Sequence, residues 1–367
     1  MNKTLLFGLL IIFTNCKILI AQTVDLSSVD EFFKVTSILK AGKSVTNEQW
    51  DSFDNSAAYR KDALREDKTF IKIIKSSINI AYIKDSLIKR ENLLSITPEE
   101  MIESTTMLLE KRILINYLEV DKHYDSILAF RQTYDFNALI DKAIQRLSSF
   151  VGIQIDSTTK LKPVYLFFVD ADGGVRDDAL YIDFNLLYKL TEKQRVNFLA
   201  HEYFHDFREK FENHDFNYKC DLYYMLDMIQ NEGIADRIDK SEGYEKYFSD
   251  VGESDEMVEI WVNLYNHAQR DLERFHDLTI KYSKGEISET EMIDELIEIV
   301  KFNGHHIGFY MANQIMDAGY KSEMLDTFYN PYRFYVLYNK SAKLLTLFQL
   351  SDEFMDYLRS ITKGYYH

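Results

Sequence analysis

One helix constrains this chain most, because it is apolar almost all round yet carries three ionisable side chains on one side. Residues 198–211 read FLAHEYFHDFREKF, and a capping-box pattern in residues 191–194 predicts where the helix begins. At 100° per residue, His201 and His205 project about 40° apart, and Glu202 falls within the same arc. Ionisable groups are costly to bury without partners, so another element must supply those partners.

Two histidines one turn apart, with a glutamate directly after the first, fit a zinc site. Imidazoles at positions i and i+4 can bind one Zn²⁺ together, and His201 and His205 occupy such positions. Glu202 is offset enough not to bind the ion and close enough to take a proton from a water molecule. In the alternative interpretation, the motif is accidental and core hydrogen bonds satisfy both histidines.

A second amphipathic helix offers candidates for the remaining groups. In residues 222–236, LYYMLDMIQNEGIAD, apolar side chains recur at helical spacing, and the same face continues to Glu232 and Asp236. Catalytic zinc needs a third protein ligand, for which Glu232 is our candidate. Asp236, one turn further on, can accept the outer ring N–H of a ligand histidine. The alternative is that these acids form a helix cap or a surface pair.

The rest of the sequence predicts an α+β protein in which helices dominate. Only 3 prolines and 13 glycines occur among the 367 residues, and 46% of the residues are hydrophobic, which favours an ordered and helix-rich chain. Residues 26 to about 150 read as a succession of helices. The clearest of these has Thr97 as its cap and Pro98 at its first position.

A short β segment interrupts the helices in the middle of the chain. Residues 162–170 and 179–184 are rich in aromatic and β-branched side chains, which predicts two strands. The Gly-Gly segment at 171–178 predicts a turn between them. We therefore expect a hairpin, or a pair of strands in a small sheet.

The N-terminal segment predicts export. Residues 1–21 combine Lys3, an apolar run and a final Ala21, as a cleavable secretory signal does. One alternative is an uncleaved membrane anchor, although the apolar run is short for a bilayer span. The other is a lipid attached to Cys16. We expect no transmembrane span in the mature chain.

Charge and cysteine content limit which binding partners and which metal ligands are possible. Loss of residues 1–21 removes two lysines and no acid, so the net charge moves from −16 to −18. Nucleic acid is therefore not an expected partner, because phosphate binding needs a basic face. Cys16 lies in the signal segment, which leaves Cys220 without a second cysteine. A disulfide framework is thus excluded, and any metal must be held by histidines and carboxylates.

The segments HEYFH and NEGIAD together resemble the gluzincin metallopeptidases, in which HExxH lies on one helix and Glu-x-x-x-Asp on the next. The resemblance implies a zincin-like core with zinc bound by His201, His205 and Glu232. It also implies Glu202 as general base and Asp236 as partner of a ligand histidine. An upstream strand borders the substrate in that family, and the segment ALYIDF occupies this place.

One difference from the family's sequence pattern limits which kind of peptidase activity is expected. The Gly-x-Met-Glu-Asn segment, with which large zinc aminopeptidases hold an amino terminus, has no counterpart before the metal helix; DGGVRDDALYI stands there instead. Aminopeptidase action is therefore not expected. The layout is more similar to uncharacterised zinc-dependent peptidases of bacterial envelopes, a family name that itself rests on HExxH.

The tail contains candidates for a hydrogen-bond donor to the oxyanion of peptide hydrolysis. Residues 302–320, FNGHHIGFYMANQIMDAGY, read as a helix after an Asn-Gly-His-His start. Related peptidases take this donor from a Tyr or His downstream of the third ligand. Tyr310 and His306 are our candidates, with His305 in reserve. The alternative is that Tyr310 is a core residue and the histidines lie in a surface turn.

Together these features predict a zinc-dependent peptidase of peptide or protein substrates. Its expected parts are a signal peptide at 1–21, a helical region at 22–150, and a zincin-like region at 151–367 with a small mixed sheet, two zinc-bearing helices and a helical C-terminal lobe. Two other functions remain open. One is a catalytically silent zinc- or peptide-binding relative, and the other is a helical interaction protein with an accidental motif.

Overall fold

The computed structural model describes residues 23–63, 68–83, 86–95, 105–155, 159–170, 172–176, 178–211 and 221–362. The predicted signal segment with Cys16, the helix start at Thr97 and Pro98, and Cys220 lie outside these residues. Helices dominate, with one small sheet, so the predicted α+β class with predominant helix is confirmed. Within the described residues, none of the helices is both long and apolar enough to span a membrane.

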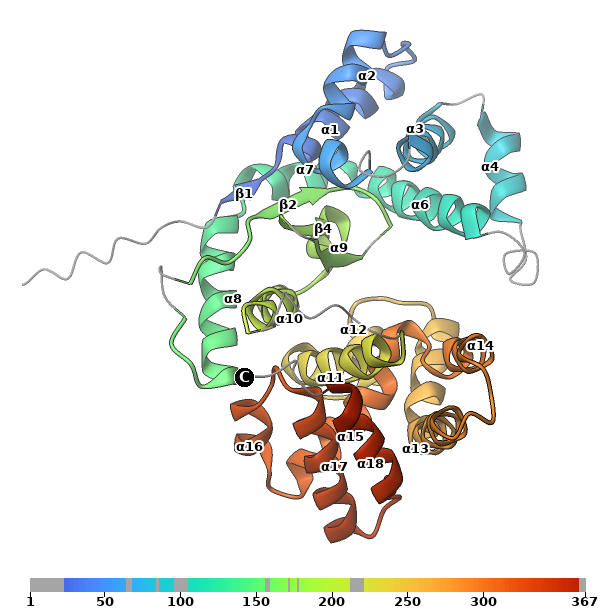
Figure 1. Cartoon of the computed structure of the whole chain (residues 1–367). Coiled ribbons are helices and arrows are strands. Elements are labelled where there is room, and N and C mark those ends of the chain that lie inside the picture. Colours follow the sequence, from blue (N-terminus) through green and yellow to red (C-terminus); the bar gives the residue numbers. More distant parts are fainter. Residues whose placement is uncertain are drawn as a thin grey trace, which may run out of the picture.

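The N-terminal elements surround one side of the sheet (Figure 1). They are β1 (Val24–Asp25), α1 (Ser27–Lys40), α2 (Asn47–Asp54), a π-helical turn (Tyr59–Ala63), α3 (Lys68–Tyr82), α4 (Leu87–Leu94), α6 (Thr105–Lys122), α7 (Tyr124–Thr133) and α8 (Phe136–Val151). Helix α1 packs on the sheet, and α8 packs along the helix that carries HExxH.

The sheet has the order β1-β2-β4-β3. Its central strands are β2 (Val164–Phe167) and β4 (Leu180–Asp183), and β3 (Gly173–Val175) lies at one edge. Both central strands lie within the predicted strand segments. Strand β2 pairs in parallel with β1 and β4, with Val164 opposite Leu180, whereas β3 pairs antiparallel with β4.

The β segment differs from the prediction in two details. The segment 171–178 is more than a turn, because residues 173–175 form β3. The segment ALYIDF is an inner strand, since β4 has neighbours on both sides, and the edge of the sheet beyond it belongs to β3. Of the two predicted arrangements, the pair of strands in a small sheet is confirmed, because β2 and β4 are parallel neighbours; the hairpin is β3–β4. A three-residue strand of two glycines and a valine shows too little β pattern to be recognised from sequence.

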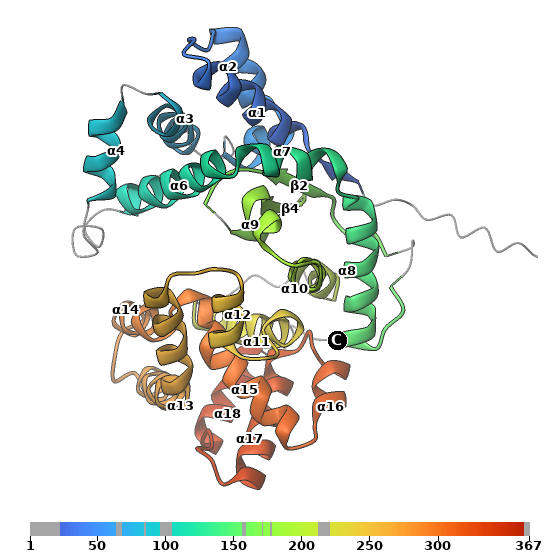
Figure 2. The same cartoon turned by 180° about the vertical axis from the view of Figure 1, so that it is seen from behind.

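The remaining helices follow the sheet. They are α9 (Phe184–Lys189), α10 (Glu192–Glu209), α11 (Asp221–Asp239), α12 (Tyr244–Asp250), α13 (Asp255–Ser283), α14 (Glu289–Ile299), a 3₁₀ turn (Phe302–Gly304), α15 (His305–Asp317), α16 (Lys321–Asp326), α17 (Pro331–Leu345) and α18 (Asp352–Thr362). Figures 1 and 2 show α10 and α11 between the sheet with its N-terminal helices on one side and helices α13 to α18 on the other.

Buried side chains connect the sheet and its N-terminal helices with the C-terminal helices. One hydrophobic core runs from Val29 in α1 to Leu358 in α18. Within it, Arg208 of α10 is 1% exposed and forms an ion pair with Asp227 of α11. The predicted division near residue 150 stays a prediction, although α8 ends at Val151.

Helices α11 and α15 cross in direct backbone contact. A Cβ atom added to Gly233 would lie 2.2 Å from the carbonyl carbon of Gly308, and one added to Gly308 would lie 1.9 Å from the carbonyl oxygen of Ile229. Only glycine allows such an approach. This crossing holds the first turn of α15 next to Glu232 and its neighbours on α11.

Candidate metal centre

Helix α10 presents the two histidines of HExxH side by side. It begins at the predicted capping box, in which the Thr191 side chain accepts from Gln194 N and the Gln194 side chain accepts from Thr191 N. The ring centroids of His201 and His205 lie 4.8 Å apart, with the ring planes at 79°. Because His201 is only 4% exposed, the helix brings these rings into the protein interior.

Helix α11 places Glu232 against both rings. Glu232 Oε2 lies 3.6 Å from His201 Nε2 and 3.4 Å from His205 Nε2. Zinc binds nitrogen and oxygen donors at about 2.0–2.1 Å, so two donors of a tetrahedral site lie about 3.3–3.4 Å apart. The donor atoms of the three residues are all within 4.8 Å of one another. Their spacing therefore fits a single zinc ion.

The outer ring nitrogens of both histidines have hydrogen-bond partners. His201 Nδ1 lies 3.0 Å from Asp239 Oδ1, and His205 Nδ1 lies 3.0 Å from Asn231 Oδ1. Both partners are acceptors, so each Nδ1 carries a proton, and each Nε2 offers a free electron pair when its ring is neutral. The two Nε2 atoms are the ones that face Glu232, as a metal site requires.

Excess negative charge surrounds these donors. The carboxylates are those of Glu202, Glu232, Asp236 and Asp239, against the ammonium group of Lys240. Burial alone would lower the pKa of His201, but the carboxylates of Asp239 and Glu232 together outweigh it and raise that pKa to about 10. Burial lowers the pKa of His205 to about 4. The surroundings thus favour positive charge at this point, and a divalent cation can supply it in place of the proton on His201.

Glu202 lies beside the donors without belonging to them. It is 6% exposed, and its Oε1 is 3.6 Å from where a Cβ atom of Gly173 in β3 would stand. Burial raises the pKa of Glu202 to about 7, and the nearby negative charge of Glu232 acts in the same direction. A carboxyl group tuned to neutral pH is suited to proton transfer.

The comparisons with known proteins identify the family of this chain. Residues 50–346, well over half of the chain, match a family model described as "Putative zinc dependent peptidase (DUF5700)". The chain belongs to this family. The range matched by the DUF5700 model contains His201, Glu202, His205 and Glu232. The searches of curated proteins and of solved structures gave no match.

Asp236 faces the site from α11, as predicted, but its shortest contact with a histidine is to His305 and not to a proposed ligand histidine. Its carboxylate is 3.8 Å from His201 Nδ1, and Asp239, one turn further along α11, accepts from that nitrogen instead. Asp236 contacts His305 Nδ1 at 3.0 Å and accepts a hydrogen bond from Tyr244 at 2.8 Å. Sequence reasoning missed Asp239, although it continues the same helix.

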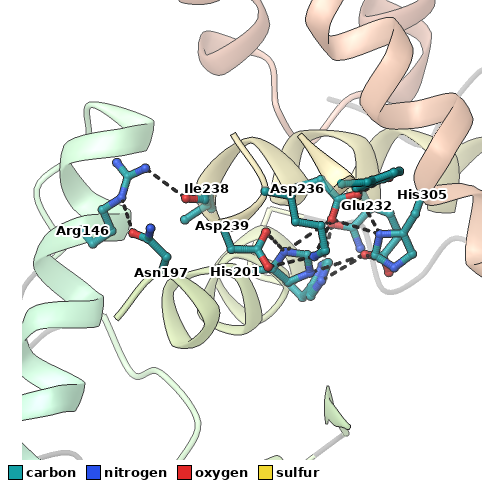
Figure 3. A network of polar contacts seen from close by, with 12 residues as sticks. Arg146, Asn197, His201, Glu232, Asp236, Ile238, Asp239 and His305 are labelled. Carbon is teal, nitrogen blue, oxygen red and sulfur yellow. Dashed lines mark hydrogen bonds and ion pairs between the residues drawn. The ribbon is translucent and has the colours of Figure 1, made fainter. Parts of the chain in front are cut away.

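Of the candidates in the tail, the structure brings His305 to the site. His305 Nε2 lies 3.4 Å from Glu232 Oε2 (Figure 3). His306, the next residue, turns toward α13, with Nε2 3.5 Å from Asp271. Tyr310 donates a hydrogen bond to Gln269, also on α13. This geometry favours the reserve candidate, because successive residues of a helix point in different directions.

Helix α8 of the N-terminal region contacts both α10 and α11 from one side of the site (Figure 3). Arg146 donates to the side chain of Asn197 on α10 at 3.0 Å and to the carbonyl oxygen of Ile238 on α11 at 3.1 Å. Asn197 lies one turn before His201, and Ile238 directly precedes Asp239. One guanidinium group therefore ties together the helices whose relative position sets the donor spacing.

Proposed function

We propose that this protein hydrolyses peptide bonds with a zinc ion held by His201, His205 and Glu232. The observation that carries the proposal is that Glu232 Oε2 lies 3.6 Å from His201 Nε2 and 3.4 Å from His205 Nε2, with the three atoms within 4.8 Å of one another. When bound, zinc lowers the pKa of a water molecule and polarises a carbonyl group. Membership of a zinc-dependent peptidase family supports the same conclusion.

Glu202 is the proposed general base. Its carboxylate takes a proton from the attacking water and then passes it to the amine that leaves when the peptide bond breaks. Burial keeps Glu202 out of bulk solvent, and it follows His201 directly on α10, so its carboxylate stays beside the three donors. A resident base in a water-poor site exchanges its proton with the substrate instead of the solvent.

His305 is the proposed donor to the oxyanion, in place of Tyr310 and His306. Its outer nitrogen Nδ1 lies 3.0 Å from both carboxylate oxygens of Asp236, which fixes the ring. The opposite nitrogen, Nε2, faces the carboxylate of Glu232, and the charges of Asp236 and Glu232 raise the pKa of His305 despite its burial, so that Nε2 also carries a proton that it can donate. A ring anchored in this way can stabilise negative charge as it develops on a carbonyl oxygen next to the zinc donors.

The substrate backbone is proposed to pair with the free edge of β3. This strand ends the sheet, and Gly173 lies against Phe198 and Glu202 of α10. An extended peptide that adds to a sheet edge gains main-chain hydrogen bonds whatever its sequence. Pairing with β3 brings such a peptide close to the proposed base.

The decisive experiment compares wild type with Glu202→Gln in zinc content and in cleavage of a peptide library. Glu202→Gln should keep near-stoichiometric zinc and lose hydrolysis by a factor of about 10² or more, because the proton acceptor is gone. His201→Ala should lose both zinc and activity. Glu209→Gln, on the same helix but half-buried and paired with Lys162 instead of the site residues, is the matched control and should retain both.

Two results would contradict the proposal. A Glu202→Gln protein that cleaves like wild type excludes the glutamate base. A wild-type protein that binds zinc but cleaves no peptide is the catalytically silent relative considered from the sequence. We further propose export of the mature chain and peptide or protein substrates, with no nucleic-acid partner, on the sequence arguments already given.

A further inference from the structure

Lys240 lies behind the proposed metal site, between the carboxylates of Asp236 and Asp239. Lys240 follows the last residue of α11, and its Nζ is 2.8 Å from Asp236 Oδ1 and 2.8 Å from Asp239 Oδ2. Its side chain is 9% exposed. Lysine is almost never buried to this extent unless it is paired, so the two carboxylates hold it there. The ring of Tyr247 covers it, 4.9 Å from Nζ.

Each of these carboxylates supports a different histidine. Asp239 accepts from His201, a proposed zinc ligand, at 3.0 Å. Asp236 lies 3.0 Å from His305, the proposed oxyanion donor. Figure 3 shows the two acids side by side on α11 with one histidine against each. Lys240 is therefore the common partner of two carboxylate–imidazole pairs.

Removal of this cation would disturb both pairs. Asp236 and Asp239 are fully buried neighbours of like charge, and their carboxylates repel each other without Lys240 between them. Rotation of either carboxylate away from the other breaks its contact with a ring nitrogen. The geometry of two histidines, contributed by two different helices, thus depends on one side chain that touches neither of them.

We propose that Lys240 is a positioning residue with two separate effects. Through Asp239 it orients His201 and so supports metal binding; through Asp236 it orients His305 and so supports turnover. The second effect rests on the proposed peptidase function, whereas the first needs zinc binding alone. A purely structural lysine would change neither quantity in the folded protein.

The test measures zinc affinity by chelator competition, and kcat and KM at saturating zinc, in Lys240→Met and Lys240→Arg. Loss of support behind a metal ligand lowers metal affinity about 10- to 100-fold, which is the effect expected for Lys240→Met. Its kcat should fall about tenfold or more, with KM within about twofold of wild type. Lys240→Arg keeps the charge and should restore both quantities to within a few fold. If Lys240→Met does not fold, Lys240→Gln takes its place.

Double mutants separate the two effects. In an Asp239→Asn background, Lys240→Met should cause no further loss of zinc affinity. In an Asp236→Asn background, it should cause no further loss of kcat. Lys75→Met removes a half-buried ion pair with Asp54 in the N-terminal region and should leave zinc affinity and kcat unchanged.

Independent, multiplicative losses in both backgrounds would overturn the proposal, as would a folded Lys240→Met protein with wild-type zinc affinity and kcat. Failure of the peptidase function has a different signature, because wild type then cleaves no peptide. In that case the zinc-affinity cycle of Lys240 and Asp239 still decides the first effect.

Discussion

The Gly233–Gly308 crossing allows a quantitative test of how α11 and α15 are held together. In Gly233→Ala, the new Cβ atom would lie 2.2 Å from the carbonyl carbon and 2.3 Å from the carbonyl oxygen of Gly308, whereas ordinary contact begins at 3.4 Å. These neighbours are backbone atoms and cannot rotate away. Helix α15 must therefore move by about 1.2 Å or more relative to α11.

The expected cost follows from two opposing contributions. Forced backbone shifts in a packed interior cost about 1–3 kcal/mol, and a clash with backbone belongs at the upper end. Alanine is the better helix former and returns about 0.8–1.0 kcal/mol. We expect Gly233→Ala to lower the free energy of unfolding by about 2 kcal/mol, measured by urea denaturation in the presence of a chelator. Zinc affinity should also fall about tenfold or more, because Glu232 directly precedes Gly233.

Gly152→Ala provides the control. Gly152 caps the end of α8 with a φ of +71°, and a Cβ atom added to it would have no neighbouring atom within 4 Å. Alanine in this left-handed conformation costs about 1–2 kcal/mol through the backbone alone. The two variants should lose similar stability, yet only Gly233→Ala should lose zinc affinity. A Gly233→Ala protein that unfolds at or above the wild-type urea concentration would refute the close crossing.

Four further outcomes are expected. Removal of zinc by a chelator should lower the free energy of unfolding, because the metal ligands come from two helices and converge only in the folded protein. The expected loss is about 2.7 kcal/mol relative to protein at a free zinc concentration 100 times the Kd. Asn231→Leu should lower zinc affinity about 10- to 100-fold in chelator competition, since His205 loses its acceptor; unchanged affinity would exclude this support. Arg208→Met should cost about 3–5 kcal/mol in urea denaturation, because Asp227 is left unpaired in the interior. Thr191→Ala should cost about 1 kcal/mol in the same assay by removing the cap of α10, and no loss would mean that the cap is redundant.

Sequence periodicity predicted the elements that carry the site because long helices have strong signals. The capping box at Thr191 and the apolar spacing of residues 222–236 predicted α10 and α11, and the structure contains both. The sequence contains no comparable signal for the direction in which a side chain at the end of a helix points. His305 and His306 are adjacent in sequence, and only the rotation of the first turn of α15 decides which of them faces Glu232.

The β segment and the support behind the histidines were harder to predict for physical reasons. Strand β3 contains two glycines, which give no β pattern in the sequence, and the small size of Gly173 is required by packing against Phe198. Asp239 and Lys240 look like ordinary polar residues at a helix end. Their role arises from the packing of α10 and α15 against that end, which is a tertiary contact.

The arrangement of the donors has a consequence for how the molecule responds to its ligands. The imidazoles belong to α10, which packs against α8 and β3, whereas Glu232 belongs to α11, which packs against α15 and α17. An ion bound by both helices would link the elements around α10 to the elements around α11. A peptide that contacts both β3 and the start of α15 would raise the affinity for zinc. By thermodynamic reciprocity, zinc would raise the affinity for that peptide by the same factor.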